Sequence, residues 1–169
     1  IRQSLVGSEM CIRDSINAFT DVVLSTADIT VTDNVSKSEA DLIDAYSGTS
    51  GTVTLTSITD TVSNINTVQT NTDISLAASA ITVTDNASFA NATDINAFTT
   101  GQVTLEKVKD LVANVSSINA ITTTDVSMAA AAITVTDDAT LANANDLNGF
   151  TTGQVTLEKV KDLVANVSS

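Results

Sequence analysis

The residues best suited to chemistry are aspartates that return at a fixed spacing. Asp33, Asp85 and Asp137 recur every 52 residues, and each is followed by an Asn or, in the last case, by Asp138. Carboxylate and amide oxygens are preferred ligands of Ca²⁺, and the chain carries 20 acidic against 7 basic residues, a net charge of −13. These four aspartates are therefore candidate metal ligands in local calcium sites.

Two arguments favour a structural role for the same aspartates. If two strands separate successive copies, equivalent carboxylates lie about 9–10 Å apart, whereas ligands lie about 2.3–2.6 Å from a Ca²⁺ ion. One ion cannot then be shared between copies, and backbone carbonyls or a neighbouring loop would have to complete each site. Asp85 and Asn86 also follow a strand-like segment, where such residues cap the next helix. We favour capping of the following helix, with calcium as the alternative and no other cofactor.

The sequence offers little for catalysis. It contains no His and one Cys, Cys11, in a segment that we set aside below. The usual general base and the usual thiol nucleophile are therefore missing. The pair Asp137 and Asp138 is replaced by Asp-Asn in the other copies, and a feature repeated in every unit is typical of structure, since active sites are few per protein. We predict that the protein is not an enzyme and has no catalytic residues.

Threonines form a third pattern. They flank apolar valines in the segments around Val31, Val83 and Val135, and they recur in the second strand-like segment of each unit: Thr30, Thr32, Thr52, Thr54, Thr82, Thr84, Thr104, Thr134, Thr136 and Thr156. Stacked Thr-x-Thr rows resemble the flat faces of ice-binding β-solenoids. Thr also suits any exposed strand position, and Gln102 and Gln154 interrupt the row. Ice binding is therefore a minor alternative.

The first fifteen residues differ from everything that follows. Residues 5–14 read Leu-Val-Gly-Ser-Glu-Met-Cys-Ile-Arg-Asp, which resembles an in-frame translation of a transposase-type sequencing-library adapter. We therefore expect 1–15 to be non-native and disordered, and we exclude it from fold reasoning. Its two basic and two acidic residues cancel, so the net charge of the remainder is still −13.

The rest of the chain is an internal repeat. The hexapeptide that starts at Ile29 returns at Ile81 and at Ile133, and residues 98–117 are identical to residues 150–169. We divide the chain into a diverged first repeat (16–80), a second repeat (81–132) and a truncated third repeat (133–169). We expect the whole to be a fragment of a longer array, in which each unit packs against its neighbours.

Each unit is predicted to contain two strands and two helices. In the second unit, 81–84 alternates as a half-buried strand, and Phe89, Ala92, Ile95 and Phe98 follow at helical spacing. Gly101 is expected to end that helix, before a second strand at 102–105. A second amphipathic helix is predicted from about Leu105, with Val108, Leu111, Val112, Val115 and Ile118 on its apolar side. Residues 73–80 suit a tight turn or a short third strand, and we favour the turn.

The order strand, helix, strand, helix predicts an α/β fold, because such repeats give parallel strands joined by right-handed crossovers. We predict an open repeat solenoid with two strand–helix units in each repeat of about 52 residues. Separate small α+β domains are the alternative. We disfavour them because about 52 residues without disulfides rarely hold a core alone.

Composition and repetition together suggest the setting. The chain is rich in Thr, Asp and Ala, and its net charge of −13 disfavours nucleic-acid binding. Its longest apolar run, 128–133, is far shorter than the roughly 20 residues of a membrane span. In these respects 16–169 resembles the tandem-repeat regions of large secreted or surface-layer/adhesin-like bacterial proteins. The resemblance implies an extracellular or cell-surface location and a non-catalytic structural or adhesive role. The expected partners are neighbouring repeats of the same chain and an extracellular ligand.

Overall fold

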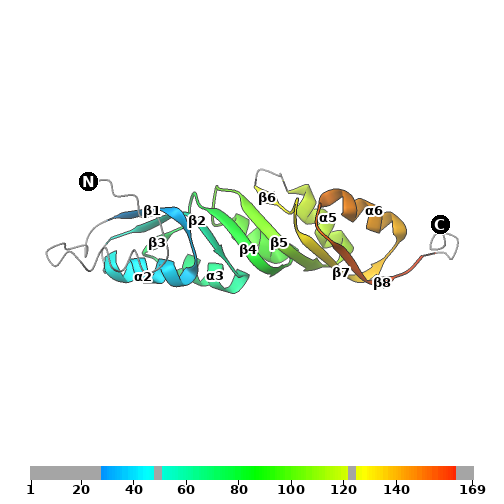
Figure 1. The fold of residues 1–169 in the computed structure, drawn as a ribbon, viewed down its shortest axis with the longest axis horizontal. Coiled ribbons are helices and arrows are strands. Elements are labelled where there is room, and N and C mark those ends of the chain that lie inside the picture. Colours follow the sequence, from blue (N-terminus) through cyan, green and yellow to red (C-terminus); the bar gives the residue numbers. More distant parts are fainter. Residues whose placement is uncertain (1–27, 48–50, 122–124, 163–169) are drawn as a thin grey trace.

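A computed structural model describes residues 28–47, 51–121 and 125–162, so the expectation for 1–15 lies outside the described residues. Strands and helices alternate along these ranges (Figure 1). They are β1 (Ile29–Val35), α2 (Lys37–Ser47), β2 (Val53–Asp60), α3 (Val62–Thr70), β3 (Ile74–Ser75), β4 (Ala80–Ala87), α4 (Phe89–Asn96), β5 (Val103–Asp110), α5 (Val112–Ala120), β6 (Val126–Ser127), β7 (Ala132–Ala139), α6 (Leu141–Phe150) and β8 (Val155–Val160).

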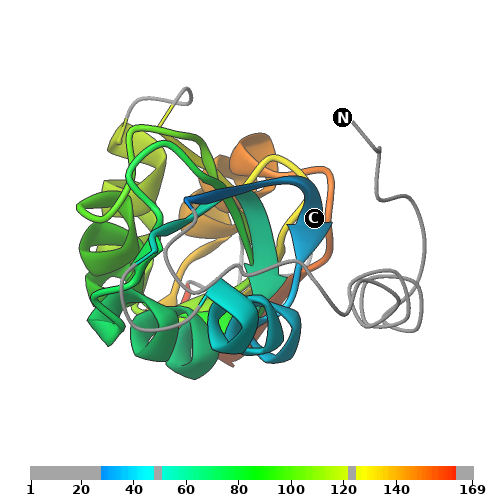
Figure 2. The ribbon, with the colours of Figure 1, turned by 90° about the vertical axis from the view of Figure 1, so that its left-hand side faces the viewer.

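The described strands form one parallel sheet. Its order is β1-β2-β4-β5-β7-β8, with the two-residue strands β3 and β6 beside β2 and β5. Every pairing is parallel, and each long strand lies beside the next long strand in the chain. The end view in Figure 2 shows the sheet curling, with the helices along one side of it. The predicted α/β class with parallel strands is confirmed.

Strand register repeats along the sheet. Ile81 of β4 lies opposite Val103 of β5, and Ile133 of β7 lies opposite Val155 of β8 in the same way. The register between repeats differs from the register within a repeat. Ile133 lies opposite Val108 of the preceding repeat, which is five residues further along β5 than Val103. Each of the strands β1, β4 and β7 also contains one extra residue relative to its partner, and in β4 the register shifts after Val83. An extra residue of this kind bends the strand that contains it.

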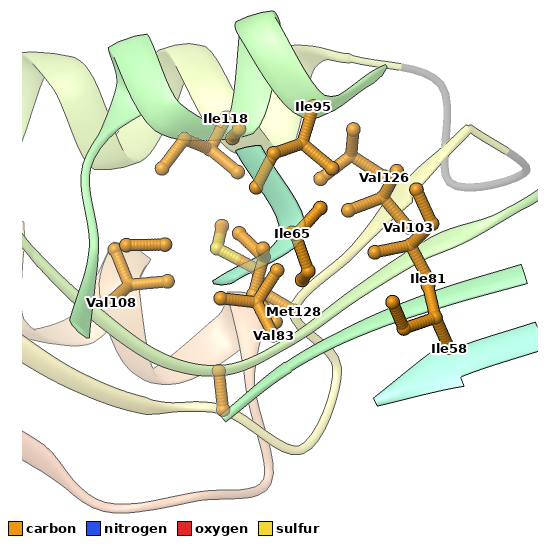
Figure 3. Packing of buried hydrophobic residues seen from close by; sticks show 14 of the residues in the cluster. Ile58, Ile65, Ile81, Val83, Ile95, Val103, Val108, Ile118, Val126 and Met128 are labelled. Atoms are coloured by element: carbon orange, nitrogen blue, oxygen red, sulfur yellow. The ribbon is translucent and has the colours of Figure 1, made fainter. Parts of the chain in front are cut away.

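The core lies between the sheet and the helices and is almost entirely aliphatic (Figure 3). Ile81, Val83 and Val108 from the sheet and Ile95 and Ile118 from the helices are all within 1% of complete burial. They belong to one cluster that includes buried residues from Val35 to Leu147. Phe89 and Phe98 only pack against its margin. Among the described residues, no helix is long and apolar enough to cross a membrane.

The second strand of each unit is longer than predicted, and the helix after it begins later. Leu105 and Val108 are buried in β5, which runs to Asp110, and α5 begins only at Val112. The prediction of a helix from Leu105 is therefore wrong. Residues 107–110 pair with β7 on one side of β5, and this ladder holds them extended. Leu111, expected on the apolar face, is 44% exposed.

Two turn predictions also need correction. Helix α4 ends at Asn96 and is closed by Ala97, so Gly101 does not end it. For residues 73–80 we considered a tight turn or a short third strand, and the structure contains both. Ile74 and Ser75 form a short strand against β2, and the turn that follows is closed by a hydrogen bond of 3.0 Å from the Ser79 amide to the Leu76 carbonyl.

Candidate functional site

The recurring aspartates lie where the sheet meets the helix layer. One carboxylate oxygen of Asp85, in β4, accepts a hydrogen bond of 2.8 Å from the Val62 amide. Asp137, in β7, accepts one of 2.9 Å from the Val112 amide. Val62 and Val112 are the first residues of α3 and α5, whose amides at that point have no partner within the helix. Each aspartate therefore caps a helix that precedes its own strand.

Three further aspartates make the same contact on the other helices. Asp60 accepts a hydrogen bond of 2.8 Å from the Lys37 amide of α2. Asp110 accepts one of 2.8 Å from the Phe89 amide of α4, and Asp162 accepts one of 2.7 Å from the Leu141 amide of α6. Every described helix thus receives at its first residue a carboxylate from the next long strand of the chain or, for Asp162, from just beyond the end of β8. We call these five contacts the aspartate clasps.

The prediction that Asp85 and Asp137 cap the following helix is wrong, because residues next to those helices do so. The cap of α4 is Ser88, whose hydroxyl accepts from the Asn91 amide while the Asn91 side chain accepts from the Ser88 amide. Thr140 and Asn143 form the same capping box at α6. Such a box satisfies two amides that would otherwise be unpaired, and the clasp satisfies a third.

Asp60 and Asp110 hold two helices at once. The second carboxylate oxygen of Asp110 accepts hydrogen bonds of 2.8 Å from the Leu111 amide and 2.7 Å from the Asn114 side chain. Burial by itself would raise the pKa of Asp110, but hydrogen bonds from Phe89, Asn114 and Leu111 outweigh it and lower the pKa below its usual value. The same balance, with Lys37 nearby, lowers the pKa of Asp60. The ionised carboxylate is therefore the form that the fold holds.

A second contact joins successive units near the amino ends of β4 and β5, and again near those of β7 and β8. The Thr99 hydroxyl donates to the Ser79 carbonyl at 2.7 Å and accepts from the Gly101 amide at 2.8 Å. A Cβ atom on Gly101 would lie 2.2 Å from the Ser79 carbonyl oxygen, which explains the glycine. In the next unit, Thr151 and Gly153 make the same contacts with Ala131.

The four predicted metal ligands are not brought together. Asp33 and Asp138 are exposed, whereas Asp85 and Asp137 are half-buried and each commits one oxygen to a helix amide. Equivalent strands of successive copies (β1, β4 and β7) are two strand spacings apart, with one long strand between them. Within the part of the chain that the structure describes, no three His, Cys, Asp or Glu side chains lie close enough to hold a metal ion. Calcium binding stays a prediction that these contacts do not favour.

The threonine rows are interrupted at the repeat boundary. Thr59, Thr82 and Thr104 lie opposite one another on neighbouring strands. In the next repeat Thr134 lies opposite Thr156, but the residue opposite Thr134 on β5 is Lys109 and not Thr104. The sheet also curls (Figure 2), while an ice-binding face is flat. Neither feature favours the ice-binding alternative.

Sequence reasoning missed Asp60, Asp110 and Asp162. A signal was present, since each stands two residues before a Val, at the end of a strand-like segment, and the three recur at intervals of 50 and 52 residues. The pattern is typical of an aspartate that caps the helix directly after it, and Asp60 and Asp110 do accept hydrogen bonds from the amides of the residues that follow them. The second partner of each aspartate, a helix amide, lies 21 or 23 residues earlier in the chain, and only the sheet register brings the two together.

No protein-family model, curated protein or solved structure matches this chain.

Proposed function

We propose that this chain is a non-catalytic structural or adhesive segment of a large extracellular bacterial protein, built as an open repeat solenoid with right-handed crossovers. On this proposal the repeats serve as spacing and display material, and their first partner is the neighbouring repeat. Calcium binding by the acidic turns is the alternative.

The observation that carries the proposal is the set of aspartate clasps. In each case the first amide of a helix donates to an aspartate that lies in, or just after, the next long strand of the sheet. A unit built in this way has a complete set of hydrogen bonds only when another unit follows it. Stability then comes from the interfaces between neighbouring units as well as from each unit itself. This arrangement suits a chain that acts as an extended spacer.

The surface supports the same proposal. The exposed side of the sheet carries Thr, Lys and Glu side chains, such as Thr54, Thr156 and Glu158. A solvated polar face of this kind, with a high net charge of −13, keeps a long array soluble.

Inserting further copies of residues 81–132 tests the proposal. Each copy should add two sheet strands, so the maximum dimension measured by small-angle X-ray scattering should rise by about 9–10 Å per copy. The midpoint of urea unfolding should also rise with copy number, because each copy adds interfaces.

A control insertion uses the same 52 residues with Asp85 and Asp110 replaced by Ala. It should give the same increase in length with a smaller gain in stability. Much larger steps in length, with an unchanged unfolding midpoint, would show independent globules and overturn the proposal.

A further inference from the structure

The two edges of the sheet expose side chains whose counterparts in the interior are buried. Val160 of β8 is 60% exposed, whereas Val108, its counterpart one repeat earlier, is completely buried. At the other edge, Ile29 is only partly buried, while Ile81 and Ile133 are completely buried. In the interior, the covering element is the neighbouring strand: β7 lies along β5 and places Ile133 opposite Val108.

We infer that β8 of one molecule pairs in parallel with β1 of a second copy of this chain, giving head-to-tail assemblies. The inference rests on the stacked architecture proposed above. Residues 155–160 repeat the sequence of 103–108, and residues 29–33 repeat that of 133–137. The register between β5 and β7 can therefore be transferred directly. It places Val160 opposite Ile29 of the second copy, and Lys161 opposite its Thr30.

Charge at the two edges favours this pairing. In the interior, Lys107 lies opposite Ala132. The transferred register places Lys159 opposite Asp28 of the second copy, because Asp28 occupies the position of Ala80 and Ala132. Asp28 and Lys159 are both exposed. The two edges thus carry opposite charges at matching positions, and the interior joints lack this pair.

Asp33 differs from its interior counterparts in the same way. It occupies the position of Asp85 and Asp137, which are half-buried against the helices that they cap, but Asp33 is exposed.

The two edges lie at opposite ends of the elongated molecule (Figure 1). A contact between unlike surfaces that does not close on itself produces an open chain. The expected product is therefore a linear series of oligomers and not a closed dimer.

Sedimentation velocity of the full chain across a wide concentration range tests the inference. We expect the weight-average mass to rise with concentration. Val160→Lys should weaken association by about tenfold or more, because it places a charge in the apolar centre of the joint. Leu42→Lys is the matched control, since Leu42 is also an exposed apolar residue, at 51%, and its interior counterpart Asp94 is exposed as well. It should associate like the unmodified chain.

A charge exchange tests the register. Lys159→Glu alone and Asp28→Lys alone should each associate poorly, because each variant opposes like charges at its own joint. An equimolar mixture should associate again, since every joint between the two variants then pairs a basic with an acidic residue.

Circular dichroism of every sample separates the two proposals. A folded chain that stays monomeric at all concentrations, or a Val160→Lys variant that associates as strongly as the unmodified chain, overturns the head-to-tail joint and leaves the array standing. A mixture that stays monomeric overturns the assigned register. A chain that lacks helix and strand signals would overturn the array as well.

Discussion

The Asp85 carboxylate lies 2.8 Å from the Val62 amide, although 23 residues separate the two in the chain. The contact joins a strand of the second repeat to the start of a helix in the first. Asp137 and Val112 repeat it one unit later. The start of each of these helices therefore depends on the next long strand, and the units are coupled by hydrogen bonds to a charged group as well as by their apolar cores.

Replacing Asp110 with Ala should destabilise the protein by about 1–3 kcal/mol, the range for losing a helix cap and hydrogen bonds to a charged group. The variant loses bonds from Phe89, Leu111 and Asn114. Urea unfolding followed by circular dichroism measures the loss. Asp94→Ala is the control, since Asp94 is exposed on α4, and it should change the stability little. Equal losses in the two variants would contradict the clasp.

The stability should fall in acid. The pKa values of Asp60 and Asp110 are lower in the folded chain than their usual value, so protonation favours the unfolded state. Their contribution is fully present above the usual Asp pKa of about 3.9 and is lost as the pH falls through the lower folded values. Urea midpoints measured from neutral pH to pH 2 check this. The double variant Asp60→Asn, Asp110→Asn should start less stable and lose less on acidification. An unchanged acid dependence in that variant would count against the clasps as its source.

Gly101→Ala should destabilise the protein by about 1–3 kcal/mol, the usual cost of overpacking. The added Cβ would lie 2.2 Å from the Ser79 carbonyl oxygen, which belongs to the backbone and cannot swing away. Gly149→Ala provides the opposite control. Nothing lies within 4 Å of that position, and Ala in place of Gly within a helix stabilises by about 0.5–1 kcal/mol. Melting temperatures should therefore move in opposite directions. A neutral Gly101→Ala variant would show that the turn does not press on the preceding unit.

Removal of divalent cations should leave the melting temperature unchanged. The oxygens of Asp85 and Asp137 that face the helices already accept amide hydrogen bonds. Melting in excess EDTA and in excess CaCl₂ compares the two states directly. A higher melting temperature in calcium that disappears in Asp137→Asn would support the calcium alternative in place of the purely structural role.

The sequence by itself determined the repeat, the α/β class and most of the core. Those features depend on spacing within a few residues: Val83 alternates with threonines, and Ala92 and Ile95 recur at helical intervals. Such local periodicity fixes which side of a strand or helix is apolar. It therefore predicted the buried positions of Ile81, Val83 and Ile95.

The tertiary structure decided where β5 gives way to α5 and what the aspartates bind. Leu105, Val108 and Val112 fit a helical stripe, and pairing of residues 107–110 with β7 is what keeps this stretch extended. The partner of Asp85 could not be read from its neighbours because Val62 is brought to it by the register between β2 and β4. Local sequence sets a residue's preference, but a contact across more than twenty residues exists only after the sheet has aligned both strands.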